Sequence, residues 1–128
     1  WKGAGYLMMA QSYMANGDHK RALAFALTAL TSQPHDEATL QVMAENLLAV
    51  GNMDQAADYF DQVLALNPKN GRAQFDRGLV AMVQGQPYQE HFAQAKQLDP
   101  AYFAKGQQRL ADIERFVQTQ QGKNDKQQ

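Results

Sequence analysis

The side chains that could do chemistry in this sequence are few and scattered. His19, His35 and His91 are the only imidazoles, and each falls at or near an expected helix start. Cysteine is absent, which excludes thiolate nucleophiles, disulfides and cysteine metal sites. His35 is followed by Asp36 and Glu37, but this run supplies too few ligands, and Asp36 suits a helix N-cap better. We therefore predict no metal site, and histidines that cap helix starts or face solvent.

The motifs of common catalytic sites are also missing. The sequence contains no G-x-S-x-G nucleophile turn, no Walker phosphate loop and no H-E-x-x-H pair. Gly3-Ala4-Gly5 lacks both the third glycine and the preceding strand of a dinucleotide-binding turn. The prediction is a protein that is not an enzyme and that needs no cofactor.

Charge and hydropathy exclude two further classes of partner. Twelve basic and thirteen acidic residues give a net charge of -1, and no stretch concentrates Lys and Arg as a phosphate-binding face would. Nucleic acid is therefore not expected as a partner. The most apolar run, Ala22 to Leu30, is about half the length that a membrane span requires. The chain begins at Trp1 without a signal-peptide pattern, so we expect a domain of a longer protein, and either the cytoplasm or a bacterial periplasm fits.

Punctuation residues recur with a period of 34. Three sets share this spacing: Gly17, Gly51 and Gly85; Ala10, Ala44 and Gly78; Pro34 and Pro68. Between them, apolar residues recur at intervals of three and four, the pattern of an amphipathic helix. Each glycine falls where one helix should end and the chain should turn, and Asp18 and Asn52 follow as N-caps. In the third unit, Pro87 fits the first position of the next helix.

This pattern resembles the tetratricopeptide repeat family, whose unit is a 34-residue helix-turn-helix with small residues where its two helices cross. The resemblance implies an all-α solenoid of about seven helices, with repeats at residues 3–36, 37–70 and 71–102. The third unit departs most, because Gln74 and Arg77 occupy normally apolar places and two residues are missing before Tyr88, so its second helix should be short or shifted. Residues 101–120 are expected to form one capping helix, and residues 121–128 a disordered tail.

In this family the first helices of the hairpins line a concave groove, which implies a set of binding residues here. The expected groove residues are Ala4, Leu7, Gln11, Met14, Gln41, Glu45, Leu48, Arg72, Phe75, Leu79 and Met82. This wall is mostly apolar, so the resemblance implies a protein-interaction scaffold that binds an amphipathic helix or hydrophobic peptide, with Glu45 and Arg72 orienting it. The known subgroup that binds acidic C-terminal tails uses a set of Lys, Asn and Arg of which only Arg72 is retained here, and Asp76 stands where its final arginine would be.

Three alternatives remain open from the sequence. Phe75, Leu79 and Met82 could pack against the capping helix instead of lining a groove. The chain could be a homo-oligomeric scaffold that docks onto copies of itself. It could also be an accessory module that regulates an enzyme in a longer parent chain.

Overall fold

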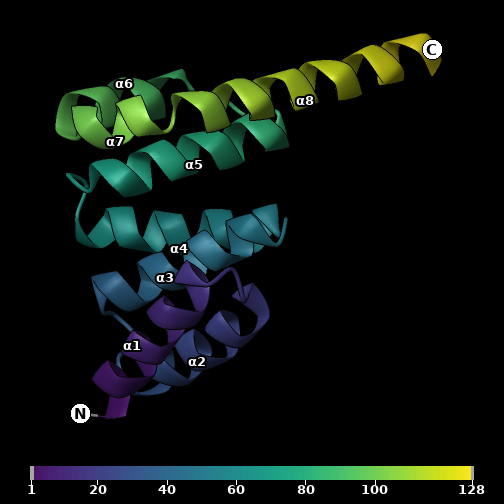
Figure 1. Ribbon diagram of the computed structural model, residues 1–128. Helices are drawn as coiled ribbons and strands as arrows, with labels where there is room; N and C mark the ends of the chain where they lie inside the picture. The colour runs from purple at the N-terminus through teal and green to yellow at the C-terminus, as the bar shows by residue number, and fades with distance from the viewer. Residues whose placement is uncertain (1, 128) are drawn as a thin grey trace.

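Helices stacked as successive hairpins make up the computed structural model, which describes residues 2–127 (Figure 1). The described residues form α1 (Lys2–Ala15), α2 (His19–Ser32), α3 (Glu37–Ala49), α4 (Met53–Leu66), α5 (Gly71–Gln84), α6 (Gln89–Leu98), α7 (Pro100–Lys105) and α8 (Gln107–Gln127). The predicted all-α solenoid is confirmed, with eight helices in this part of the chain instead of about seven. Within residues 2–127, no helix combines the length and the apolar character that a membrane crossing demands.

The turns inside the hairpins follow the expected chemistry. Gly17, Gly51 and Gly85 have φ values of 80°, 86° and 72°, a backbone conformation that only glycine adopts without strain. The side chains of Asp18 and Asn52 then accept hydrogen bonds from the backbone N–H three residues on and so cap α2 and α4. These local signals fix where each helix ends and where the next one starts.

Small residues let the paired helices approach closely. Ala10, Ala44 and Ala56 are completely buried in a core that runs through the first two hairpins and into α5. At Gly78 an added Cβ would lie 2.8 Å from the Phe92 ring, so only glycine allows α5 and α6 to cross there. The 34-residue spacing of small residues therefore marks the crossing points of the hairpins.

The third hairpin is shortened, as the two-residue deletion predicted. Helix α6 has 10 residues where α2 and α4 have 14. The expectation that Pro87 begins this helix is wrong, because α6 starts at Gln89 and its N-cap residue, Tyr88, makes no side-chain capping bond. The two polar residues at normally apolar places of the third unit both have polar partners. Gln74 Oε1 lies 2.9 Å from His91 Nδ1, and Arg77 Nε donates to Asp61 over 2.8 Å.

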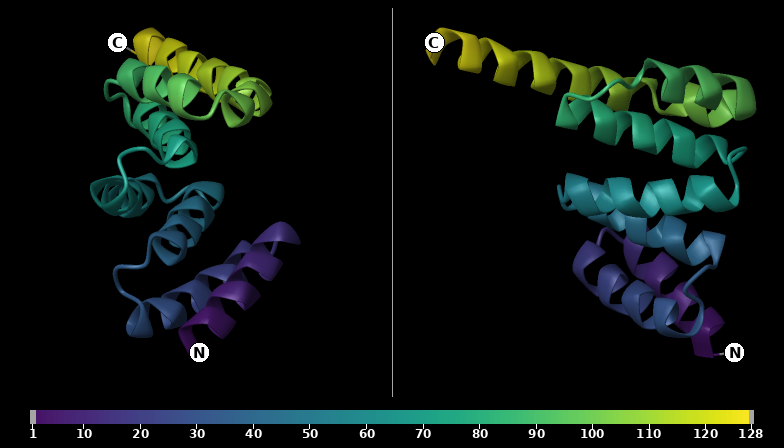
Figure 2. Two further views of the ribbon diagram at one scale, coloured as in Figure 1. Left: turned by 90° about the vertical axis from the view of Figure 1, so that its left-hand side faces the viewer. Right: turned by 180° about the vertical axis from the view of Figure 1, so that it is seen from behind.

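The C-terminal cap differs from the single helix expected at residues 101–120. It consists of α7 and α8, with a break at Gly106, where an added Cβ would clash with the ring of Phe75 on α5. Helix α8 then runs along α5 and continues past the end of α5 (Figures 1 and 2). It extends to Gln127, through most of the segment expected to be a disordered tail, because a helix already formed adds residues without a new nucleation step. Residue 128 lies outside the described residues.

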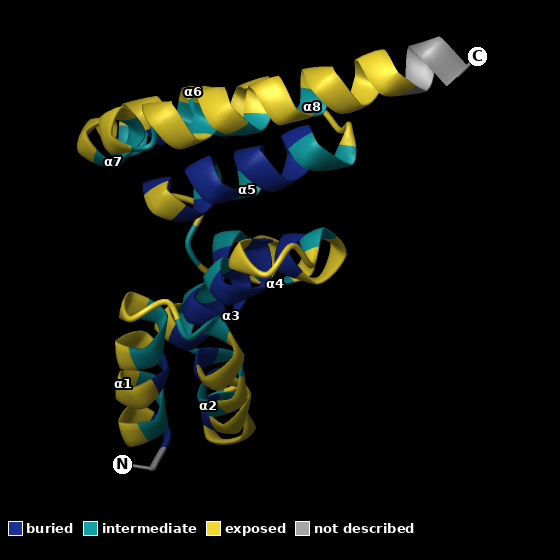
Figure 3. Cartoon of the chain, turned by 45° about the vertical axis from the view of Figure 1, so that its right-hand side comes forward, coloured by how far each residue is buried: buried dark blue, intermediate teal, exposed yellow. Residues whose placement is uncertain are grey.

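Burial is greatest in the middle of the stack. Helices α3 and α5 carry most of the buried residues, whereas α8 is exposed over most of its length (Figure 3). A second core cluster lies between α5 and the cap, where Phe75, Leu79 and Ala95 are buried. The side chains packed against these three are Phe92, Tyr102, Phe103, Leu110 and Ile113. The cap therefore closes the apolar side of the last hairpin.

Candidate functional site: a groove along the first helices

The first helices of the three hairpins line two adjoining hollows. The hollow nearer the N-termini of α3 and α5 has a volume of about 480 Å³ and is lined by Gln11, Met14, Asp36, Glu37, Ala38, Gln41, Val42, Glu45, Asn70 and Arg72. The second hollow has a volume of about 510 Å³ and is lined by Met14, Ala15, His19, Glu45, Leu48, Ala49, Arg72, Asp76, Tyr102 and Arg109. Met14, Glu45 and Arg72 line both, so the two hollows form one groove across α1, α3 and α5.

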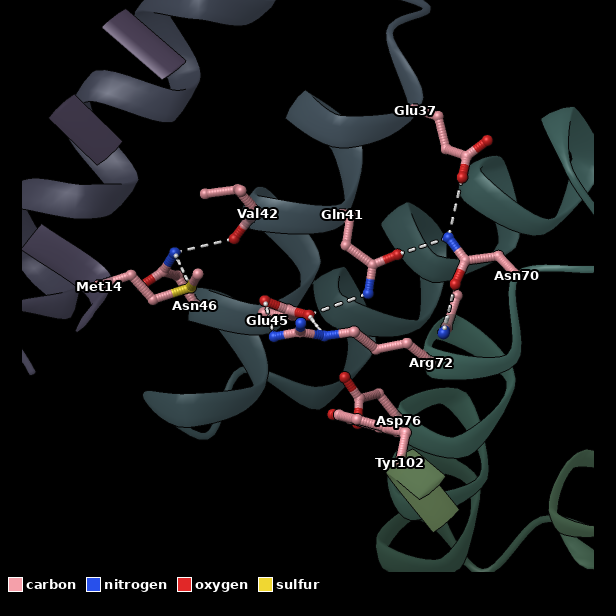
Figure 4. Close-up of polar contacts among 11 residues, drawn as sticks. Met14, Glu37, Gln41, Val42, Glu45, Asn46, Asn70, Arg72, Asp76 and Tyr102 are labelled. Carbon is pink, nitrogen blue, oxygen red and sulfur yellow. Dashed lines mark hydrogen bonds and ion pairs between the residues drawn. The ribbon is translucent and has the colours of Figure 1, made fainter. Parts of the chain in front are cut away.

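An ion pair between α3 and α5 lies at the junction of the two hollows (Figure 4). Arg72 donates to Glu45 from Nε over 2.6 Å and from Nη2 over 3.3 Å. In the structure the two side chains neutralise each other. That the pair orients a bound partner stays a prediction.

A chain of amides continues from this ion pair toward the helix N-termini. Gln41 donates to Glu45 over 2.9 Å, and Asn70 donates to both Gln41 and Glu37. Asn70 also caps α5 by accepting from the backbone N–H of Ala73. The lining of the first hollow is therefore mixed, because these hydrogen-bonded polar groups lie beside the apolar side chains of Met14, Ala38 and Val42. The mostly apolar wall expected from the sequence stays a prediction.

A buried asparagine on α3, beneath the groove residues, links α3 to α1 and α2. Asn46 is fully buried and donates to the Val42 carbonyl oxygen over 2.8 Å and to the Met14 sulfur over 3.2 Å. Its carbonyl oxygen lies 2.8 Å from His19 Nδ1. His19 thus fixes the start of α2 against α3, a structural role that differs from the capping or solvated role expected of it.

A buried carboxyl group forms the end of the second hollow. The side chain of Asp76 on α5 accepts a hydrogen bond from the Tyr102 hydroxyl over 2.9 Å. Burial, together with the charge of Glu45, raises the pKa of Asp76 to about 7. Burial and the neighbouring Asp76 raise the pKa of Tyr102, so its hydroxyl stays a donor at neutral pH. The Arg72 guanidinium lies over the Tyr102 ring at 5.2 Å from its centroid.

The structure brings together six of the expected groove residues. Gln11, Met14, Gln41, Glu45, Leu48 and Arg72 all line one or both hollows. Leu7 lines neither hollow; it is partly buried and packs against the first core cluster. Ala4, one turn before Leu7, is exposed on α1 and also lines neither.

The remaining three expected groove residues are core residues. Phe75 and Leu79 are 1% and 0% exposed, and both belong to the cluster covered by the cap. Met82 is 4% exposed and lines a separate hollow with Phe116 and Val117 of α8. For Phe75 and Leu79 the structure shows the alternative left open by the sequence, which is packing against the cap.

Several groove residues were not expected from the sequence. Tyr102 and Arg109 reach the groove from α7 and α8, and nothing in the repeat pattern links them to α1 or α3. Asp76 did carry a signal, since a charged residue within the apolar pattern of α5 needs a polar partner. Asp36 was expected only as an N-cap; it does cap α3, and it also lines the first hollow. Among the described residues, no three His, Asp or Glu side chains are grouped to hold a metal ion.

Comparison with known families identifies the repeats. Two sequence models described as tetratricopeptide repeat match residues 4–36 and 42–102. No curated protein matches the chain significantly.

Solved structures with the same fold include three at low sequence identity. MamA is 17% identical, with a TM-score of 0.72, and the match covers 97% of this chain and 81% of that one. The Yersinia enterocolitica type III secretion chaperone SycD, solved with a peptide of the translocator YopD, is 13% identical, with a TM-score of 0.73 and coverage of 92% and 93%. The first such domain of Spaghetti (RPAP3), bound to the HSP90 peptide SRMEEVD, is 14% identical, with a TM-score of 0.72 and coverage of 94% of each chain. At these identities the likeness concerns the fold alone.

Proposed function

Because the chain belongs to the tetratricopeptide repeat family, a class of generally non-catalytic protein-interaction scaffolds, we propose that it binds a segment of a partner protein in the groove across α1, α3 and α5. The observation that carries the proposal is the continuity of the two hollows through Met14, Glu45 and Arg72. A groove of this kind suits an extended segment or one helix, which would gain affinity from buried area and specificity from the amides on the floor.

The chemistry of the groove favours an amphipathic segment over a purely hydrophobic one. Met14 and Leu48 provide apolar contacts on one wall, while Gln41 and Asn70 provide amide groups along the floor. An apolar segment would bury these partly exposed polar groups and offer them no hydrogen-bond partner, which is unfavourable. The partner segment should therefore present both apolar and polar side chains.

A matched pair of variants tests this assignment. Gln11 lies on α1, is exposed and lines the first hollow, so Gln11→Trp fills the groove without disturbing the core. Gln62→Trp makes the same change at an exposed position on α4 that lines neither groove hollow. Wild-type and variant chains are immobilised, exposed to lysate of the source organism, and the captured proteins identified by mass spectrometry. Circular dichroism verifies that both variants keep their helicity.

We expect wild type and Gln62→Trp to capture the same protein, and Gln11→Trp to capture at least about tenfold less of it. Synthetic segments of that protein would then define the bound region by isothermal titration calorimetry. Capture that is unchanged by Gln11→Trp would contradict the groove assignment. Light scattering at increasing protein concentration tests the self-assembly alternative, because a rising mass with no other captured protein would favour it.

A further inference from the structure

The Asp76 carboxylate is incompletely compensated by its surroundings. It is 1% exposed, and one of its oxygens accepts the Tyr102 hydroxyl bond; among the described residues the other has no hydrogen-bond partner. The carboxylate is turned toward Glu45 and Arg72 across the second hollow (Figure 4), which it helps to line. A buried carboxylate is unfavourable unless a cation and further hydrogen bonds compensate it.

The nearby cations provide only part of that compensation. Arg72 is committed to Glu45 through two hydrogen bonds, and none of the ion pairs among the described residues includes Asp76. Arg109 lines the same hollow, but it is exposed to solvent, which weakens its effect on the buried group. Burial, followed by the negative charge of Glu45, raises the pKa of Asp76, and the two arginines do not offset this increase.

The groove as a whole carries an excess of acidic groups. Its lining includes Asp36, Glu37, Glu45 and Asp76 against two arginines, Arg72 and Arg109. An acidic peptide tail would meet Asp76 in the second hollow, where like charges repel. A basic side chain would meet a carboxylate that still has an unused oxygen.

We propose that the second hollow receives a lysine or arginine side chain of the bound segment, with Asp76 as its counter-ion at the end of the hollow. Met14 and Leu48 on the wall would contact the aliphatic stem of that side chain, which lysine and arginine commonly bury while the charged head pairs. This inference rests on the proposed function, since it names the chemistry of the segment that the groove binds.

The experiment is a selection of peptides from a random display library against the wild-type chain, repeated against Asp76→Asn. Asparagine has nearly the same shape as aspartate and still accepts the hydrogen bond of the Tyr102 hydroxyl, so Asp76→Asn should fold. Tyr102→Phe, which removes the hydrogen-bond donor to Asp76, is the second variant. Selected peptides are synthesised with a fluorescent label, and their dissociation constants are measured by anisotropy for wild type, Asp76→Asn and the groove-filling Gln11→Trp. Thermal melts confirm folding.

Peptides selected by the wild type should share a lysine or arginine at a fixed position. Replacing it with norleucine, or replacing Asp76 with asparagine, should each weaken binding by roughly tenfold, with little further loss when the two changes are combined. Groove-bound peptides, blocked by Gln11→Trp, that lack a shared basic residue would overturn this inference and leave the proposed function standing. Peptides unaffected by Gln11→Trp, or no selected peptides at all, would overturn the proposed function and this inference with it.

The pH dependence of binding gives an independent readout. The charged and titratable groups facing Asp76 are Glu45, Arg72, Tyr102 and Arg109, with His19 on the same hollow. Because the pKa of Asp76 in the free protein is about 7, a cation should bind about tenfold more tightly at pH 8 than at pH 6, where the carboxyl is mostly protonated. Asp76→Asn keeps His19 and should lose this dependence. A dependence that survives in Asp76→Asn would assign it to another group and count against the inference.

Discussion

Residues at the same repeat position differ in burial between the two ends of the helix stack. Leu7, Gln41 and Phe75 are 34 residues apart in sequence, and so are Gln11, Glu45 and Leu79. In α1 these positions are partly buried or exposed, in α3 they join a polar network, and in α5 they are fully buried. Position within the repeat sets the side of the helix on which a residue lies, whereas the next element in the stack decides its accessibility.

The cap accounts for the difference at the C-terminal end. The repeat position of Phe75 would place it beside the groove, but α7 and α8 cover this residue. The rings of Phe92, Tyr102 and Phe103 surround the Phe75 ring at centroid distances of 5.3 to 5.8 Å. On α1, by contrast, the equivalent residue Leu7 is only partly buried. Four predictions test this comparison, beginning with the one expected to have the largest effect.

Phe75→Ala should destabilise the chain by about 3–5 kcal/mol, because it removes the ring at the centre of the second core cluster. Urea unfolding followed by circular dichroism gives the free energy of unfolding. Met8→Ala removes an exposed side chain on α1 and should change that free energy by less than about 0.5 kcal/mol. Similar effects for both variants would show that the cap does not form a core with α5.

Asp76→Asn should change the pH dependence of stability. The pKa of Asp76 is raised from 3.8 to about 7 on folding, so the folded chain binds more protons between these values and loses stability as pH rises through 7. Relative to Asp76→Asn, the wild type should lose about 2–3 kcal/mol between pH 5 and pH 8. Urea unfolding at both pH values measures the difference, and Asp58→Asn, an exposed position on α4, is the control. Parallel pH profiles for wild type and Asp76→Asn would contradict the prediction.

Two glycine-to-alanine substitutions, one at each end of the helix stack, should change the stability of the chain in opposite directions. Gly106→Ala places a Cβ against the buried Phe75 ring, so we expect a loss of about 1–3 kcal/mol. Gly5→Ala on α1 meets nothing within 4 Å and should stabilise the chain by about 0.5–1 kcal/mol through helix propensity. Thermal melts of the two variants measure both effects. A neutral Gly106→Ala would mean that the break between α7 and α8 does not depend on this close approach.

The ion pair in the middle of the groove should contribute the least. Arg72 is about half exposed, so the coupling between Glu45 and Arg72 should be about 0.5–1 kcal/mol in a double-mutant cycle of Glu45→Gln and Arg72→Gln. The free energies of unfolding of the four proteins give this value. A coupling above about 2 kcal/mol would indicate that the pair holds α3 against α5, and that it does more than neutralise the groove.

The sequence predicted the fold well because its signals are local and repeated. The turn glycines, the N-caps Asp18 and Asn52, and the small residues at helix crossings all act within one hairpin, and each recurs in the next. The candidate site was predicted in part, since all three residues expected on α3 line the hollows but only Gln11 and Met14 of the four expected on α1 do. The prediction failed where the cap covers Phe75 and Leu79.

By itself the sequence determined the number of hairpins, the glycine turns within them and the positions on each first helix that recur with the repeat. Those features depend on backbone conformation and on apolar spacing over a few turns, which neighbouring residues specify. Only the tertiary structure decided which of those positions stay accessible and which polar groups meet. Tyr102 and Asp76 are 26 residues apart in the chain, and their contact arises because α7 folds back onto α5. The partly compensated carboxylate in the groove is a result of that packing.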